Sequence, residues 1–227
     1  MRKTRRQAAC LRIPSCLFMA LAVISGHSLS AQGLNIPAKE WGVSFGNSKV
    51  FAGLRFNFRD SRVERVTGIN VTLWMPRKDN LDAAVSGLSL GLIPGGGDVR
   101  GIQLGVLGAS AEKSLTGINI GGLGVGAGDN LTGINIGGIG IGAGENVKGL
   151  NFGGLGVGAG EDLAGISFGG LGVGAGENVT GLCVGGLGVG AGGNFKGLAI
   201  GGLGVGAGED LTGIDRKSTR LNSSHTR

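Results

Sequence analysis

A sixteen-residue repeat constrains the fold of this 227-residue chain more than any other feature of its sequence. The unit Leu115 to Asn130, LTGINIGGLGVGAGDN, recurs without insertion or deletion. Later copies begin at Leu131, Val147, Leu163, Val179, Phe195 and Leu211. Looser copies of its glycine-apolar-x-apolar kernel start at Gly53, Gly68, Gly87 and Gly101. Because such a period stacks one supersecondary unit on the next, we expect a single repeat array from about Trp41 onward.

Alternation inside each repeat indicates β-structure. Ile118 and Ile120 flank Asn119, and apolar residues from Leu123 to Ala127 alternate with glycine, but the parity changes at Gly121-Gly122. A corner at this glycine pair would turn both apolar sets toward one interior, and Gly128-Asp129-Asn130 suits a second corner. Two strands and two corners per repeat predict an all-β, glycine-rich β-solenoid. Ten or so coils stacked ~4.8 Å apart would be about 50 Å long.

An antiparallel outer-membrane β-barrel, with one strand and one turn per repeat, is the alternative fold. The parity break interrupts the continuous apolar face that a spanning strand needs, and the regular repeats have no Trp or Tyr for an aromatic girdle. A helical repeat is disfavoured because each complete unit contains at least six glycines, each of which costs roughly 1 kcal/mol inside a helix. The sequence therefore favours the solenoid over the barrel.

The N-terminal segment has the pattern of a secretory signal peptide. Arg2, Lys3, Arg5, Arg6 and Arg12 precede or flank a short apolar stretch from Cys16 to Gly26, and Leu29-Ser30-Ala31 offers a cleavage site. We expect residues 1–31 to be removed during export. The expected location is the cell surface, the outer membrane or the periplasm.

The C-terminal segment interrupts the repeat. Asp215 to Arg227, DRKSTRLNSSHTR, resembles a translated sequencing adapter and is interpreted as a non-native tail. The expected organisation is then a signal peptide (1–31), an irregular N-terminal β region or cap (32–114), the regular array (115–214) and the tail (215–227). Residues 32–214 contain twelve basic and fourteen acidic residues, a formal charge of −2. The high isoelectric point therefore does not indicate nucleic-acid binding.

Residues 32–214 offer few side chains that could act in catalysis. It contains no His and a single thiol, Cys183, and its acidic residues at the second corner, such as Asp129 and Glu145, have no oxygen-rich partner loop for calcium. A carbohydrate-active enzyme would need carboxylates clustered on one face. We therefore expect no enzyme activity, no cofactor and no metal. The Asn119 series is interpreted either as a hydrogen-bonded ladder or as a recognition stripe on the outer face.

The most varied side chains lie between Trp41 and Asn80. Leu54, Phe56 and Phe58 alternate with polar residues, and Ile69, Val71 and Leu73 follow a charged turn, a pattern that predicts a capping β-hairpin. The alternative is a partner-binding surface, because arginine and tryptophan are common interface anchors. The candidate partner surface comprises Arg55, Arg59, Arg62, Arg65 and Trp74.

The tandem GINIGGLGVGAG kernel, preceded by WGVSFGNSKVFAGLRFNFRD and GINVTLW, resembles the leptospiral-type bacterial surface-repeat proteins. The resemblance covers roughly Trp41 to Ile214 and implies an exported, surface-associated protein, with no catalytic residues to transfer. The expected function is that of a cell-envelope structural or interaction protein that presents a repetitive β surface. Its partner would be a protein, an envelope component or the outer membrane, and homo-oligomers are an open alternative.

Overall fold

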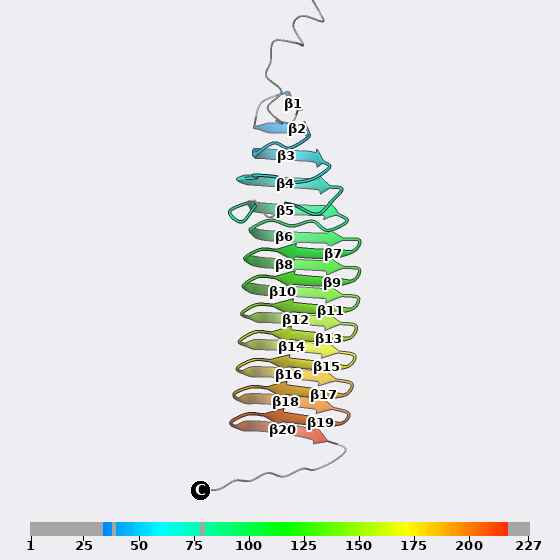
Figure 1. Ribbon diagram of the computed structural model, residues 1–227, viewed down its shortest axis with the longest axis vertical. Coiled ribbons are helices and arrows are strands. Elements are labelled where there is room, and N and C mark those ends of the chain that lie inside the picture. The colour runs from blue at the N-terminus through cyan, green and yellow to red at the C-terminus, as the bar shows by residue number, and fades with distance from the viewer. Residues whose placement is uncertain (1–33, 38–39, 78–79, 218–227) are drawn as a thin grey trace, which may run out of the picture. The chain divides into compact units, whose positions relative to one another are not determined.

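The computed structural model describes residues 34–37, 40–77 and 80–217, which form a β-solenoid of stacked coils (Figure 1). All twenty of its secondary-structure elements are strands. Within the described ranges, no helix is long and apolar enough to cross a membrane. The predicted signal peptide and residues 218–227 of the predicted tail lie outside the described residues.

A thirteen-stranded sheet, here called sheet A, runs the length of the solenoid. Its strands are β1 (Leu34–Pro37), β2 (Trp41–Phe45), β3 (Val50–Asn57), β4 (Arg65–Thr72), β5 (Ala84–Gly91), β6 (Asp98–Gly105), β8 (Ser114–Gly121), β10 (Asn130–Gly137), β12 (Val147–Gly153), β14 (Leu163–Gly169), β16 (Val179–Gly185), β18 (Phe195–Gly201) and β20 (Leu211–Lys217). β1 and β2 pair antiparallel, whereas the pairs from β2 onward are parallel. The backbone of Asp215 to Lys217, which we expected to be outside the repeat fold, continues β20 alongside β18.

A seven-stranded parallel sheet, sheet B, forms the second wall of the coils from β6 onward. Its strands are β7 (Gly108–Ala111), β9 (Gly124–Ala127), β11 (Gly140–Ala143), β13 (Gly156–Ala159), β15 (Gly172–Ala175), β17 (Gly188–Ala191) and β19 (Gly204–Ala207). The predicted coil of two strands and two corners is confirmed. The barrel alternative is wrong, because each strand pairs with its equivalent in the next coil and sheet A runs in an open order from β1 to β20.

One glycine per coil fixes the register of sheet A. Gly117 pairs with Gly133, and Gly133 with Gly149, and the upstream kernel glycines from Gly53 to Gly101 join the same column despite unequal spacing. Each has a positive φ, for example +127° at Gly117. A Cβ at Gly117 would clash with the carbonyl oxygen of Gly101. The column therefore requires glycine for both backbone angle and close strand approach.

The interior differs from the sequence-based expectation. Leu115, Asn119 and Val125 point inward and are at most 3% exposed, whereas Ile118 is 38% and Leu123 is 52% exposed. Strand alternation explains the difference, because successive side chains of a strand point to opposite faces of the sheet. Leu115 and Asn119 are an even number of residues apart and both face the interior. Ile118 and Ile120 therefore face outward. The prediction that Ile118, Ile120 and Leu123 line the core is wrong, and so is an outer-face position for the Asn119 series.

The N-terminal coils also differ from the prediction. β3 and β4, which we expected to form an antiparallel hairpin, pair in parallel with Val50 beside Arg65, so they belong to successive coils. The antiparallel pair lies earlier in the chain, between β1 and β2, at the end of sheet A. Seven residues connect β3 to β4. They return the backbone to the side of the sheet on which β4 begins and so complete the coil.

Candidate interaction surface

A continuous apolar face covers the outer side of sheet A and the corner that follows it. It consists of three rows of side chains: the first two rows have one residue in each of nine coils, and the corner row has one residue in each of seven. The first row is Ile69, Leu88, Ile102, Ile118, Ile134, Leu150, Ile166, Leu182 and Leu198. The second row is Val71, Leu90, Leu104, Ile120, Ile136, Phe152, Phe168, Val184 and Ile200. The corner row is Leu107, Leu123, Ile139, Leu155, Leu171, Leu187 and Leu203.

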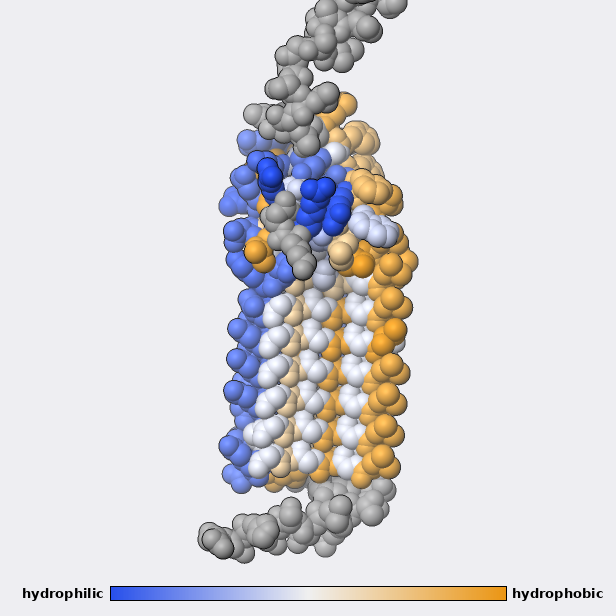
Figure 2. Space-filling view, in the orientation of Figure 1, coloured by the Kyte–Doolittle hydropathy of each residue, from blue (hydrophilic) through white to orange (hydrophobic). Residues whose placement is uncertain are grey.

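The corner row is the most exposed part of this apolar face. Its side chains are about half exposed in the regular coils, for example 49% at Ile139. Figure 2 shows a hydrophobic stripe along one edge of the solenoid and a hydrophilic stripe along the opposite edge. The repeat therefore places its largest apolar side chains outside, in columns that follow the stacking direction.

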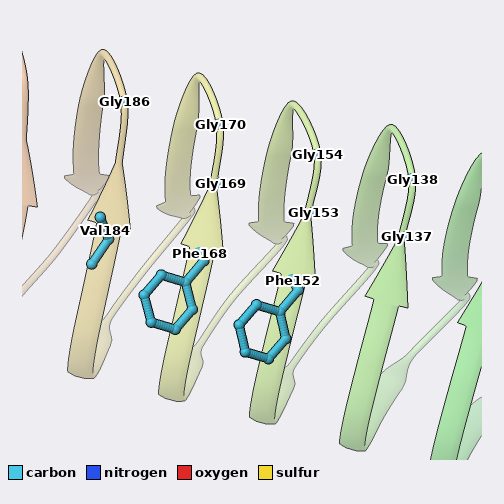
Figure 3. Close-up of a pocket in the computed structure, with 10 residues that line it drawn as sticks. All are labelled: Gly137, Gly138, Phe152, Gly153, Gly154, Phe168, Gly169, Gly170, Val184 and Gly186. Carbon is cyan, nitrogen blue, oxygen red and sulfur yellow. The ribbon is translucent and has the colours of Figure 1, made fainter.

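Two shallow hollows lie between the second row and the corner glycines. The larger, of about 560 Å³, is lined by Phe152, Phe168 and Val184 together with glycine pairs such as Gly153-Gly154. The two phenyl rings stack with their centroids 5.0 Å apart and their planes 5° from parallel. Figure 3 shows both rings projecting from β12 and β14 beside the glycine corners. A second hollow, of about 430 Å³, lies nearer the N-terminus along the same side of sheet A, between Val71 and Ile120.

The opposite corner carries the acidic column Asp129, Glu145, Glu161, Glu177 and Glu209. Two of these carboxylates accept hydrogen bonds from neighbouring amides, since Asn130 Nδ2 donates to Glu145 Oε2 at 3.2 Å and Asn194 Nδ2 to Glu209 Oε2 at 2.9 Å. Within the described ranges, no group of three or more His, Cys, Asp or Glu residues is arranged to hold a metal ion. This corner is a polar edge at which amides contact two of the five carboxylates.

The buried polar column inside sheet A is structural. Asn119 Nδ2 donates to Asn135 Oδ1 and Asn135 Nδ2 to Asn151 Oδ1, both at 2.8 Å, and Asn151 Nδ2 then donates to Ser167 Oγ at 3.2 Å. All four residues are fully buried. Of the two interpretations open at the sequence level, the hydrogen-bonded ladder is confirmed. Such ladders add side-chain hydrogen bonds along the stacking direction of parallel strands.

Arg55, the first residue of the candidate partner surface, is buried and belongs to the same interior column. Its guanidinium forms a 2.7 Å ion pair with the buried Asp60 and donates to Asn70 Oδ1 at 3.1 Å. Asp60 also accepts a hydrogen bond from Thr72 Oγ1 at 2.9 Å. Including Arg55 in an exposed surface was therefore wrong. This network places paired polar groups in the interior of the N-terminal coils, beside buried apolar side chains such as Phe51 and Val66.

The other four predicted residues do not form one patch. Arg65 starts β4, while Trp74 follows its end, so a strand of eight residues, about 25 Å, separates them. Arg62 lines a small hollow with Lys49 and Asp82 at the start of that coil. Arg59 is half-buried, with its Nε donating to the carbonyl of Met75 at 3.1 Å. The apolar face was not predicted from the sequence. Strand parity places Leu115 and Ile118 on opposite sides of sheet A, but it does not show which side is outside.

Cys183 occupies the interior column between Ser167 and Ala199. It is fully buried, and this desolvation raises the pKa of its thiol to about 12. A thiol held neutral and away from solvent is neither nucleophile nor metal ligand at ordinary pH. Its role is that of a small packing residue.

Comparison with known proteins identifies no relative. No family model, curated protein or solved structure matches the chain.

Proposed function

We propose that the chain is an exported structural or interaction protein of the cell envelope, which presents a repetitive β surface to a partner and has no catalytic activity. The observation that carries this proposal is the apolar face, with three outward rows of large aliphatic and aromatic side chains. Contiguous exposed apolar patches above a few hundred Å² mark interaction sites. The basic n-region, the short apolar stretch and the resemblance to surface-repeat proteins support export.

The chemistry of the surface supports a binding role over a catalytic one. The described ranges contain no His, their only Cys is buried, and the carboxylates of the acidic column lie on the corner opposite the apolar face. The formal charge of −2 for residues 32–214 does not favour a nucleic-acid partner. The proposed partner is a protein or another envelope component that offers apolar surface.

Processing and surface labelling of the full chain test the proposal. We expect cells that express the complete gene to yield a mature chain that begins near Gln32. In intact cells or after outer-membrane permeabilisation, a membrane-impermeant amine reagent should label the exposed Lys148 and Lys196. The matched control replaces Leu21 and Val23 in the apolar stretch with Arg, which should block export. A wild-type chain that keeps residues 1–31 and is labelled only after complete lysis would refute the proposal.

A further inference from the structure

The apolar face is large enough to form a stable protein interface. Its first and second rows span nine coils, from β4 to β18, and its corner row spans seven, from Leu107 to Leu203. With strands ~4.8 Å apart and a width of about 15 Å, its footprint is on the order of 600 Å². Stable interfaces bury roughly 600 to 1,000 Å² on each partner. The face therefore reaches the lower end of this range without help from other surfaces.

The face contains both a projection and a hollow that could receive it. The stacked rings of Phe152 and Phe168 form a ridge near the middle of the second row. Beside the ridge, the glycine pairs at the corners leave the larger hollow open. An isologous interface needs this arrangement, because the same patch must serve as both partners. Aromatic residues, phenylalanine included, are enriched in protein interfaces.

The spacing and the charge of the solenoid favour a second copy over a lipid surface. Each row repeats once per coil, and the surface certain to share this spacing over the same length is the identical face of another chain. The acidic column, with Asp129, Glu145 and Glu161 among its members, runs along the opposite corner. Anionic headgroups attract clusters of basic side chains near the membrane surface. Only Arg100, Lys148 and Lys196 place basic groups in the outward row between the acidic column and the apolar face.

We propose that the chain forms a homodimer through the apolar face. The Phe152–Phe168 ridge of each copy packs against the larger hollow of the other copy, which is lined by the corner glycines. This inference rests on the proposed function, because it names a second copy as the partner of the same surface. Facing sheets pack about 10 Å apart. That spacing would bring the outward rows of the two copies into contact.

The molar mass of the purified, cell-processed chain tests the dimer directly. We expect sedimentation equilibrium to give twice the monomer mass for the wild type. Phe152→Glu should weaken the dimer at least tenfold, because it places a carboxylate at the centre of an apolar interface. Thr180→Glu is the matched control, since Thr180 is also exposed on sheet A, lies outside the three rows and gains the same charge. Circular dichroism establishes that both variants keep the β fold.

A cross-linking variant keeps the test decisive if Phe152→Glu fails to fold. In a Cys183→Ala chain, Phe152→Cys should form an intermolecular disulfide under mild oxidation, whereas Thr180→Cys should not. A wild-type monomer at high micromolar concentration would overturn the dimer. So would a monomer that pellets with phosphatidylcholine vesicles, which would identify lipid as the occupant, or a dimer that is indifferent to Phe152→Glu.

The two proposals fail in different ways. A processed, surface-labelled chain that sediments as a monomer would overturn the dimer and leave the proposed function standing. A dimer that remains in the cytoplasm with residues 1–31 attached would overturn the proposed function and leave the dimer standing.

Discussion

At the residue scale, glycine has two distinct roles in each coil. In sheet A, Gly149 has a φ of +116°, and an added Cβ would clash with the carbonyl oxygen of Gly133. In sheet B, an added Cβ at Gly158 meets no atom within 4 Å, and its φ is outside the left-handed region. Only the first glycine is demanded by the fold. The second glycine leaves the outer surface of sheet B flat, although no neighbouring atom of the chain would prevent a side chain there.

Alanine substitutions separate these two roles. Gly149→Ala should lower the free energy of unfolding by at least about 2 kcal/mol, because it combines an unfavourable backbone angle with a steric clash. Gly158→Ala should raise it by about 0.5 to 1 kcal/mol, because it reduces the entropy of the unfolded chain without strain. Urea denaturation of the two variants measures the difference. Equal effects at the two positions would contradict the assignment.

Cys183 gives a prediction about pH. Burial raises the pKa of its thiol from 9.0 to about 12, so above pH 9 the thiol ionises in the unfolded chain but stays neutral in the folded chain. The contribution of Cys183 to stability is thus complete below pH 9 and is lost as pH rises toward 12, by up to about 1.4 kcal/mol per pH unit.

Comparison with Cys183→Ala isolates this contribution, because Ala199 fills the same column one coil later. Between pH 9 and 12 the wild type should lose stability faster than the alanine variant in parallel thermal melts. Parallel curves for the two chains would argue against a buried neutral thiol.

At the element scale, each coil of the regular array joins a strand of seven or eight residues to a strand of four through two corners. The alternation of residues and the glycine corners were sufficient to predict this arrangement. Which side of sheet A faces inward was not predictable from hydrophobicity, because the interior is narrow and Leu115 and Val125 already supply its apolar contacts. The Asn119 column can be inside because each Asn Nδ2 donates to the oxygen of the next member along the stack.

The interior ladder should be sensitive to the loss of one member. Asn135→Ala removes a donor and an acceptor together and leaves Asn119 Nδ2 and Asn151 Oδ1 buried without their partners. The expected loss is about 2 to 4 kcal/mol of unfolding free energy. Thr132→Ala, on the outward side of the same strand, should change it by less than about 0.5 kcal/mol. A loss at Asn135 as small as that at Thr132 would show that the ladder contributes little.

At the scale of the whole molecule, the period of sixteen residues was enough to predict the solenoid, because a strict repeat permits few other stacked arrangements. The location of the interaction surface was not predictable by residue type alone. Arginine and tryptophan suggested a partner site, but Arg55 pairs with Asp60 inside the coil and Trp74 lies a strand length from Arg65. Long-range pairing decides such positions, and Arg55 meets Asn70 only because two coils stack.

Electron–electron distances between spin labels test the stacking of coils most directly. In a Cys183→Ala chain diluted with unlabelled protein, labels at Thr116 and Thr180 lie four coils apart, and labels at Thr116 and Thr212 lie six coils apart. With ~4.8 Å per coil, the solenoid predicts separations of about 19 Å and about 29 Å between equivalent points of these strands. An increase of about 10 Å from the first pair to the second would support the stacked solenoid. Distances that do not grow with the number of intervening coils would contradict it.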